Sequence, residues 1–349
     1  MKLYSNEIVF RGHPDKVCDQ ISGALLRAYM DKDRDTRAGI EVMGGKGKIF
    51  VTGEVTSKAK VNVPRIVKRV LDDCGYDKEK YEIIDNLGVQ SADIALGTNN
   101  EVGGAGDQGM MFGYATKETD KYLPKAMVIL QEFAAWYAWL CDEDFDFLSD
   151  GKAQITGIYD DNFNLVKIKT FLVSYQNREN HRPYTDGVIR DFIQHLCKFH
   201  YNVEVEEIII NPTGKFLIGG FDGDAGLTGR KIQVDAYQSF ANVGGGCMNG
   251  KDPSKVDFSA AHKARQLAVR FVDEYDLRWC EVQLSYAIGL PEPLAIYVDS
   301  NKGNIEVPKE IYKECTPARI IEDLKLKDLD YEKLAMFGHF REKTQILLK

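Results

Sequence analysis

The sequence predicts an α+β protein in which one sheet-and-helix architecture is used three times. The principal observation is that strand and helix patterns recur in the same order at a spacing of roughly 110–120 residues. The chain has 349 residues, which is enough for two or three domains of ~100–200 residues each. In every repeat we expect helices to cover one face of a sheet.

The first block combines a hairpin, a helix and a short strand. Strands are expected at Gly39–Met43 and Lys48–Val55, joined by a glycine-rich turn over 44–47. Apolar residues at helical spacing predict a helix over Val63–Cys74, and a short strand follows near Glu82–Ile84. We expect the same order of elements twice more.

The second and third blocks repeat this order with one variation in the third. In the second block, two strands flank a turn over 160–162 and are followed by a helix and a strand: Ala153–Tyr159, Leu165–Gln176, Thr185–Phe199 and Val205–Ile210. In the third, a strand precedes a helix and two further strands: Ile232–Tyr237, Phe258–Glu274, Cys280–Ala287 and Leu294–Val298. Long stretches without predicted helices, Asn86–Gly106 and Asn211–Ser254, separate the blocks, and such loops are usually functional or mobile.

Charge and cysteine usage exclude several classes of protein. Lys and Arg number 45 against 53 Asp and Glu, for a net charge of −8, which argues against nucleic-acid binding. The seven cysteines are scattered and form no C-x-x-C pair, so a reducing, cytoplasmic location is expected. The longest apolar stretch, Ala126–Leu140, contains polar residues and is too short to span a bilayer. We therefore expect a cytoplasmic protein with no nucleic-acid or membrane partner.

A glycine-rich and basic segment, residues 211–255, carries the most unusual chemistry. It holds ten of the chain's 31 glycines together with five Lys and Arg residues. Glycine lets backbone N–H groups approach an anion closely, and the cationic side chains supply countercharge, so a polyphosphate is the expected ligand. The run GLTGRK at 226–231 is not a Walker A sequence. A surface loop of turns with solvated charges is the alternative.

A second cluster, GHPDK at 12–16, precedes an apolar helical pattern over Val17–Met30. Pro14 suits a first helical turn, so His13, Asp15 and Lys16 would lie at the positive end of a helix, where phosphate binds readily. Asp15 would repel a bare phosphate, which implies a bridging Mg²⁺. The alternative is an ordinary helix cap beside a surface histidine.

Other catalytic schemes fit poorly. The run GAGDQG at 104–109 matches G-x-G-x-x-G, but the residues before it do not form a strand pattern and Asp107 would face a pyrophosphate. The histidines lack the spacing of a zinc site, and there is no G-x-S-x-G elbow. Cys247 follows three glycines, but no neighbouring motif marks it as a nucleophile.

Four motifs together resemble the S-adenosylmethionine synthetase family over nearly the whole chain. They are GHPDK at 12–16, GAGDQGMMFGYAT at 104–116, GLTGRK at 226–231 and GGGCMNGKDPSKVD at 244–257. The resemblance implies three similar domains around a pseudo-threefold axis, with boundaries at 1–97, 102–217 and 219–341. It also implies a homodimer, or a tetramer, with active sites in the subunit interface.

The resemblance further implies a methionine adenosyltransferase reaction. The sulfur of L-methionine attacks C5′ of ATP, and the triphosphate that leaves is hydrolysed to phosphate and pyrophosphate. Two Mg²⁺ ions per site and a K⁺ ion are implied as cofactors. Such chemistry needs alignment and a cationic cage, since a neutral thioether attacks without a general base.

Matching each motif position implies a role for individual residues. The catalytic cage would comprise His13, Lys152, Arg230, Lys231, Lys251 and Lys255. Further ATP contacts would come from Asp150, Lys215, Phe216, Asp224 and Cys247. Methionine would be bound by Glu54, Gln90, Asp107, Asp224 and Lys255. Asp15 and Asp257 would bind Mg²⁺, Glu41 would bind K⁺, and a loop from Gln90 to about Gly103 would gate the site.

The sequence departs from the family pattern in several places. Arg11 replaces a usual Glu, which would add positive charge beside the triphosphate, and Gln238-Ser239 replaces a usual Gly-Gly. The gating stretch and the C-terminal region are short for the family. A non-catalytic, nucleotide-binding paralogue is therefore one alternative. An ATP-dependent ligase or kinase of another fold is a second alternative, which would release ADP or AMP.

Overall fold

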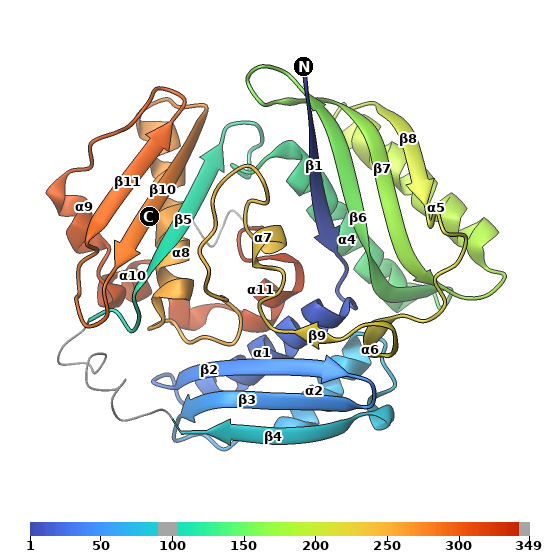
Figure 1. Cartoon of the computed structure of the whole chain (residues 1–349), viewed down its shortest axis with the longest axis horizontal. Coiled ribbons are helices and arrows are strands. Elements are labelled where there is room, and N and C mark those ends of the chain that lie inside the picture. The colour runs from blue at the N-terminus through green and yellow to red at the C-terminus, as the bar shows by residue number, and fades with distance from the viewer. Residues whose placement is uncertain (90–103, 342–349) are drawn as a thin grey trace.

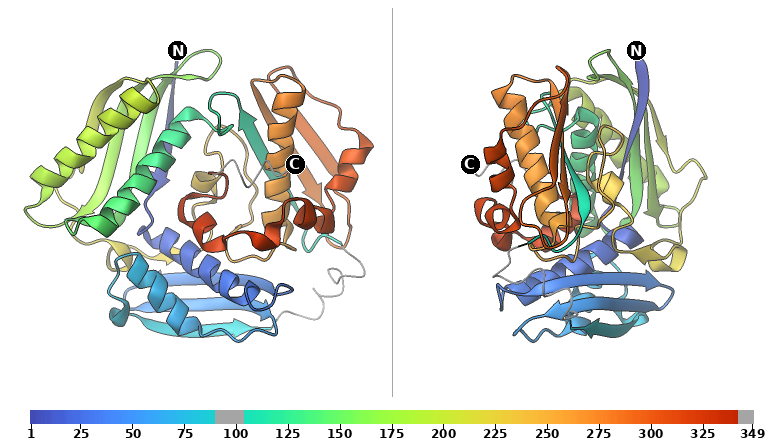
Figure 2. Two further views of the ribbon diagram at one scale, coloured as in Figure 1. Left: turned by 180° about the vertical axis from the view of Figure 1, so that it is seen from behind. Right: turned by 60° about the vertical axis from the view of Figure 1, so that its left-hand side comes forward.

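The computed structural model describes residues 1–89 and 104–341 and contains three separate β-sheets. The sheets are arranged around the middle of the molecule, with the helices on their far side (Figure 1). Seen from behind, the helices lie in front of the sheets (Figure 2). The predicted α+β class, with helices against one face of each of three sheets, is confirmed.

The N-terminal sheet has the order β4-β3-β2-β9. Strands β2 (Arg37–Gly45) and β3 (Lys48–Thr56) form the expected hairpin, and β4 (Glu82–Gly88) runs parallel to β3. Helices α1 (Pro14–Met30) and α2 (Val63–Asp73) cover one face (Figure 2). A 3₁₀ turn, η1 (Lys78–Lys80), connects α2 to β4.

The central sheet has the order β1-β6-β7-β8. Its long hairpin consists of β6 (Phe147–Tyr159) and β7 (Leu165–Asn177), with β8 (Val205–Ile210) parallel to β7. Its helices are α4 (Lys125–Glu143) and α5 (Arg182–His195), and α5 continues into the π-helical turn η2 (Leu196–His200). The apolar stretch Ala126–Leu140 is thus a core helix of this domain.

The C-terminal sheet has the order β11-β10-β5 and is covered by α8 (Val256–Glu274). Its strands are β5 (Gly109–Thr116), β10 (Trp279–Tyr286) and β11 (Ala295–Ser300). Short helices complete the chain: α9 (Lys309–Glu314), α10 (Pro317–Asp323), η3 (Leu326–Asp328) and α11 (Tyr331–Phe337).

Each sheet contains one edge strand from a distant part of the chain. Strand β1 (Lys2–Val9) pairs with β6, β5 pairs with β10, and β9 (Gly226–Leu227) pairs with β2. The sheets therefore interlock in a cycle instead of following three consecutive segments. This exchange brings the start of α1 and the glycine-rich segment onto the same sheet.

The expectation of a strand at Ile232–Tyr237 is wrong. Residues Ile232–Asp235 form a single helical turn, α7, and Gly220–Gly223 form another, α6. The stretch Asn211–Ser254 is accordingly not free of helix. Alternating Ile232, Val234 and Ala236 match a strand pattern, but Asp235 donates its N–H to Lys231 O (2.8 Å), which closes a helical turn.

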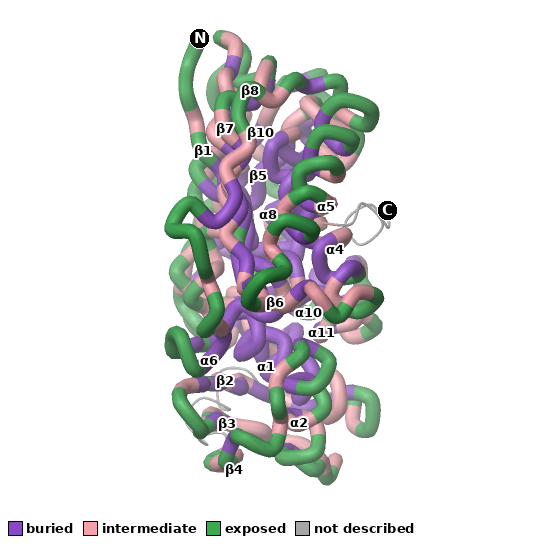
Figure 3. The backbone as a smooth tube through the Cα atoms, turned by 90° about the vertical axis from the view of Figure 1, so that its right-hand side faces the viewer, coloured by how far each residue is buried: buried purple, intermediate pink, exposed green. Residues whose placement is uncertain are grey.

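Buried residues concentrate in the layer between sheets and helices (Figure 3). Along β10 the residues alternate between buried positions facing α8 and half-buried positions on the opposite side, and β2 and β6 alternate similarly. In the part of the chain that the structure describes, no long helix covers the half-buried side, and we call it the open face. Within residues 1–89 and 104–341, no helix is long and apolar enough to cross a membrane.

Candidate active site

The N-terminus of α1 forms the first part of the site. His13 is the N-cap residue, and its Nδ1 accepts a hydrogen bond from the Asp15 N–H at 3.2 Å. Pro14 occupies the first helical turn, where a missing N–H costs nothing. His13 and Asp15 are both buried. The expected helix start is therefore confirmed, and it places both side chains beside the glycine-rich segment.

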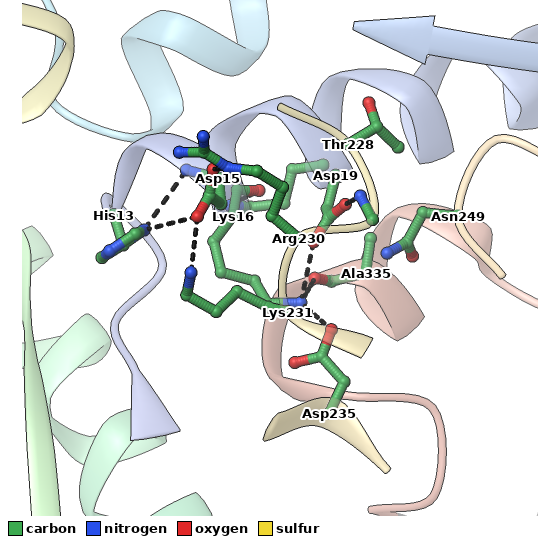
Figure 4. A network of polar contacts seen from close by, with 12 residues as sticks. His13, Asp15, Lys16, Asp19, Thr228, Arg230, Lys231, Asp235, Asn249 and Ala335 are labelled. Atoms are coloured by element: carbon green, nitrogen blue, oxygen red, sulfur yellow. Dashed lines mark hydrogen bonds and ion pairs between the residues drawn. The ribbon is translucent and has the colours of Figure 1, made fainter. Parts of the chain in front are cut away.

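Asp15 connects α1 to the loop that follows β9 (Figure 4). Its Oδ1 accepts hydrogen bonds from the Leu227 N–H (3.0 Å) and Arg230 Nε (2.8 Å). Its Oδ2 accepts one from Lys231 Nζ (2.6 Å). A Cβ at Gly226 would collide with the backbone of Pro14, so only glycine allows the loop to lie this close. The structure thus gathers His13, Asp15, Arg230 and Lys231 at one helix end.

The cations at this helix end set the protonation states of its neighbours. Burial acts to raise the pKa of Asp15, but hydrogen bonds from Lys231, Leu227 and Arg230 outweigh it, and the pKa is lowered. Burial, together with the charge of Lys231, lowers the pKa of His13 to about 4. Asp15 is therefore ionised and His13 is neutral at physiological pH.

A buried polar network lies one helical turn further along α1. Asp19 Oδ1 accepts the Gly229 N–H at 3.0 Å, and Lys16 Nζ lies 3.1 Å from Asp19 Oδ2. Lys16 Nζ also binds Asp235 and donates to Ala335 O at 3.1 Å (Figure 4). Lys16, Asp19 and Asp235 are all buried. Asp15 and Asp19 thus bind the same loop from successive turns, and Lys16 points into the protein instead of toward a ligand.

A second cationic group lies where β2, β3 and the start of α8 meet. Lys251 Nζ pairs with Asp257, and Lys255 Nζ lies 4.0 Å from Glu54 Oε1. Burial raises the pKa of Glu41 despite the opposing charge of Lys251. Burial also raises the pKa of the Cys247 thiol, so Cys247 is a neutral neighbour and not a thiolate nucleophile.

Several candidate residues point to the open face. On β2, Glu41 lies between two buried residues and is paired with Thr52 of β3. On β3, Glu54 is half-buried and is paired with Gly39. Lys152 is exposed between the buried Gly151 and Ala153 of β6. Part of the candidate site therefore faces outward, on the side without helices.

Asp150 holds the turn that precedes Asp224. Its Oδ2 accepts the Gly220 N–H at 2.7 Å, and α6 then leads directly to the exposed Asp224. Burial raises the pKa of Asp150 to about 6, although the Gly220 and Gly151 N–H groups lower it. Asp150 thus fixes the position of the α6 turn, which leads to Asp224 and then to the loop that carries Arg230 and Lys231.

Three further candidate residues lie outside these groups, and one is not described. Lys215 and Asp107 are exposed, and Phe216 is half-buried beside Asn177, whose Oδ1 accepts the Phe216 N–H at 2.7 Å. Gln90 and the expected gating loop to Gly103 lie outside the described residues.

The expectation that Arg11 adds free charge beside the triphosphate is wrong. Arg11 Nη1 donates to Asp142 Oδ2 at 2.9 Å, and Nη2 donates to the other carboxylate oxygen. Asp142 lies in the last turn of α4, so the guanidinium points toward the helical side of the molecule. The main sequence argument for a non-catalytic paralogue is thereby removed.

Sequence reasoning missed Asp19, Asp235 and Asn249. His339 Nε2 lies 2.8 Å from Asn249 Oδ1, which fixes the loop before Lys251. The spacing of Asp15 and Asp19, four residues apart on one helix face, was a usable signal for Asp19. Nothing local marks Asp235 or Asn249, because their partners lie far away in the sequence.

The donor groups fit metal ions only in part. No cluster of three or more His, Cys, Asp or Glu side chains suited to a metal occurs in the described part of the chain. Asp15 and Asp257 offer the oxygen ligands that Mg²⁺ prefers, but each is paired with lysine. Because the half-buried carboxylate of Glu41 has a raised pKa, a bound cation would stabilise its charge.

The three-sheet fold and a cationic, glycine-rich loop at a helix N-terminus define a class of α+β proteins suited to a polyphosphate ligand. Comparison with known proteins identifies the member of this class. Residues 1–94, 102–216 and 218–348 match the N-terminal, central and C-terminal domains of S-adenosylmethionine synthetase, respectively. The S-adenosylmethionine synthase of Petrotoga mobilis (strain DSM 10674 / SJ95) is 39% identical, over 98% of this chain and 94% of the relative.

The chain therefore belongs to the S-adenosylmethionine synthetase family. Its activity is the formation of S-adenosylmethionine from methionine and ATP. The family uses a divalent metal and potassium.

Proposed function

We propose that the sulfur of methionine attacks C5′ of ATP while the residues at the N-terminus of α1, namely His13, Arg230 and Lys231, hold the triphosphate. The observation that carries this assignment is Asp15, buried between Arg230 and Lys231 at the N-terminus of α1. A helix N-terminus with two adjacent cations and a glycine-rich loop favours a polyphosphate. The triphosphate that leaves is then hydrolysed to phosphate and pyrophosphate.

His13 is proposed to donate a hydrogen bond to the leaving oxygen. Because Nδ1 accepts the Asp15 N–H, the proton of the neutral ring is on Nε2. The low pKa keeps the ring uncharged before ATP binds. A preorganised donor aimed at developing charge lowers the barrier, typically by ~10²–10³ in rate.

Arg230 and Lys231 are proposed to exchange partners when ATP binds. In the free enzyme both bind Asp15. Phosphate oxygens carry more negative charge than one carboxylate and accept the same hydrogen bonds. Release of Asp15 would leave its oxygens available for a cation, and Lys152, Asp150, Asp224, Lys215 and Phe216 are proposed to complete the nucleotide site.

Asp15 and Asp257 are proposed to hold the two Mg²⁺ ions, and Glu41 the K⁺ ion. A bound divalent ion supplies neutralisation of the charge that builds up on the leaving triphosphate. Lys251 orients Asp257 through their ion pair. Burial raises the pKa of Glu41, and the charges of Asp19 and Glu54 add to this while Lys251 opposes it, so a bound cation would stabilise the ionised carboxylate.

The methionine site is proposed to lie on the open face of the N-terminal sheet. Glu54 and Lys255 lie there with opposite charges, which suits an amino acid's ammonium and carboxylate groups. Asp107, Asp224 and Gln90 are proposed to contribute as well. Since this face is uncovered, we propose a homodimer, or a tetramer built from it, in which the partner completes the site. We also propose a cytoplasmic location.

Product analysis with an ATP analogue tests the proposed order of steps. The protein is incubated with methionine, Mg²⁺, K⁺ and either ATP or its β,γ-imido analogue. With ATP, mass spectrometry is expected to detect S-adenosylmethionine, phosphate and pyrophosphate. With the analogue, it is expected to detect S-adenosylmethionine and intact imidotriphosphate, because attack on C5′ precedes hydrolysis. Formation of ADP or AMP from ATP would contradict the proposal.

A further inference from the structure

Gln238 joins two segments of the candidate site through its side-chain amide. Glu7 N–H donates to Gln238 Oε1 at 2.7 Å, and Gln238 Nε2 donates to Glu7 O at 2.7 Å. The side chain is buried. We propose that Gln238 is a positioning residue that fixes Lys231 relative to His13.

Gln238 contacts the outer edge of a sheet. Among residues 1–89 and 104–341, β1 is the terminal strand of the central sheet, and its inner edge pairs with β6. The Gln238 amide supplies one acceptor and one donor to Glu7, as a neighbouring strand would. Tyr4 Oη also donates to Ser239 O, so the contact continues along β1. The segment after α7 is thus bound to β1 by a two-residue contact.

The backbone of Gln238 is held in a conformation that favours glycine. Its φ angle is +54°, in the left-handed region. A residue with a Cβ persists there only when the surroundings fix it. The pair of hydrogen bonds to Glu7 offsets this backbone conformation, and glycine could not form them.

The segment from Glu7 to Asp15 and the segment from Lys231 to Gln238 contact each other at both ends. The contact at Gln238 can therefore affect the site at the other end. From Glu7 the chain continues along β1 to His13, and Lys231 binds Asp15 beside His13 at 2.6 Å. From Lys231, the turn of α7 leads to Gln238, whose N–H donates to Gln233 O at 3.0 Å. The turn between Lys231 and Gln238 is therefore stiff, and a shift at Gln238 moves Lys231. The inference rests on the proposed role of Lys231 in binding the triphosphate.

Three substitutions of Gln238 separate its amide from its backbone. Gln238→Ala removes the hydrogen bonds to Glu7 and keeps the strain of a residue with a Cβ at positive φ. Gln238→Gly removes both the hydrogen bonds and this strain. Gln238→Glu keeps the side-chain size but replaces the Nε2 donor with an acceptor. Gln154→Ala is the matched control, since Gln154 lies opposite Glu7 on β6 and lines the same 360 Å³ cavity. For each variant, kcat, the KM for ATP, the KM for methionine and the thermal midpoint are measured.

All three Gln238 variants are expected to lower kcat/KM for ATP by about tenfold or more, because small misplacements in a site are costly. The KM for methionine should stay within about twofold. Gln238→Gly should unfold at a higher temperature than Gln238→Ala while its ATP kinetics remain impaired. Wild-type ATP kinetics in Gln238→Ala or Gln238→Gly, measured well below their midpoints, would overturn the inference.

Lys231→Ala distinguishes failure of this inference from failure of the proposed site. If Lys231→Ala leaves the ATP kinetics unchanged, the proposed triphosphate site is wrong, and the positioning role is wrong with it. If Lys231→Ala lowers kcat/KM for ATP but Gln238→Ala does not, only the positioning role is wrong. If both lower it, the Gln238→Ala/Lys231→Ala double variant should lose less than the product of the single effects, because both act through one group.

Discussion

His13 combines a fixed tautomer with an unusually low pKa, and both follow from its place at the end of α1. Burial and the charge of Lys231 lower the pKa to about 4. In NMR titration of the ATP-free protein, the imidazole signals of His13 should therefore not move between pH 5.5 and pH 8. Because the lowered pKa belongs to the folded state, the stability associated with the neutral ring is lost as the pH falls from 6.5 toward 4.

Lys231→Met supplies the comparison for this titration. Removing the nearby positive charge should raise the pKa of His13, while burial still keeps it below that of a solvated histidine. A His13 signal that titrates between pH 5.5 and pH 8 in the unmodified protein would contradict the assignment.

Burial raises the pKa of Asp150, whereas it lowers the pKa of His13. Its pKa is raised to about 6, so ionisation costs stability as the pH rises from 3.8 through 6. Asp150→Asn keeps an acceptor for Gly220 and removes this cost. Chemical unfolding of the ligand-free protein should show a gain of about 1–3 kcal/mol at pH 7.5. The gain should disappear near pH 4.

The exposed Asp161→Asn is the control for Asp150→Asn. It lies in the turn between β6 and β7, away from the site, and should change stability little at either pH. A stabilisation by Asp150→Asn that is equal at both pH values would mean that the effect has another cause than ionisation.

At the scale of elements, α1 is fixed to the loop and to α7 by one buried cation. Lys16 contacts Asp19, Asp235 and the carbonyl of Ala335. Its pairing with these carboxylates raises its pKa despite burial, whereas burial raises the pKa of Asp235 to about 6. Lys16→Met should lower the free energy of unfolding by about 3–5 kcal/mol, because two buried carboxylates lose their partner.

The loss in Lys16→Met should depend on pH and on the stranded carboxylates. Without Lys16, their pKa values rise, so the deficit should be largest at pH 7.5 and smaller at pH 5. Lys16→Met/Asp235→Asn removes one stranded charge and should recover part of the loss. Urea unfolding at one fixed protein concentration measures all three proteins. An equal deficit at both pH values would show that lost packing, and not stranded charge, dominates.

The sequence was most informative where neighbouring elements pair with each other. The strand over 165–176 was predicted nearly to the residue, because it alternates with period two and forms a hairpin with the strand before it. The strand over 153–159 was predicted with the correct end, but β6 already begins at Phe147. Strands β1 and β5 were missed because their partners are distant in sequence. The turn α7 was read as a strand, since alternation cannot distinguish a strand from one helical turn.

The candidate site likewise contains residues that local sequence marks and residues whose role depends on distant partners. Local charge and glycine content pointed to His13, Asp15, Arg230 and Lys231, which do meet in the fold. Asp19 lies four residues after Asp15 and three after Lys16 on α1, so its spacing was a local signal, whereas Asp235 carries none because its partner Lys16 is distant in the sequence. Arg11 was misread because its partner, Asp142, lies 131 positions away.

At the scale of the whole molecule, the open face is the feature that a single chain leaves unexplained. In the C-terminal sheet, Gln283 is paired with Tyr297 on one side and with Phe112 on the other, so their side chains form a row on this face. Met110 and Tyr297 are 56% and 47% exposed. Apolar groups exposed together on a sheet usually mark an interface.

Substitutions of exposed residues on this face test the proposed dimer and its interface active sites together. In a symmetric dimer each substitution occurs twice, so Tyr297→Asp or Met110→Asp should shift sedimentation velocity toward a monomer. Phe199→Asp is the control, because Phe199 is 70% exposed in the π-helical turn after α5, on the helical side. It should leave the sedimentation unchanged.

Measuring the activity of the separated subunits shows whether the interface contributes to the active site. Glu54, Lys255 and Lys152 lie at the open face, so separated subunits should lose S-adenosylmethionine formation while keeping their circular dichroism spectrum. Raising the protein concentration should restore both the dimer and the activity in parallel, since association follows mass action. A folded monomer with undiminished turnover would place the complete site within one chain. A dimer that survives both substitutions would require the open face of another sheet to carry the contact.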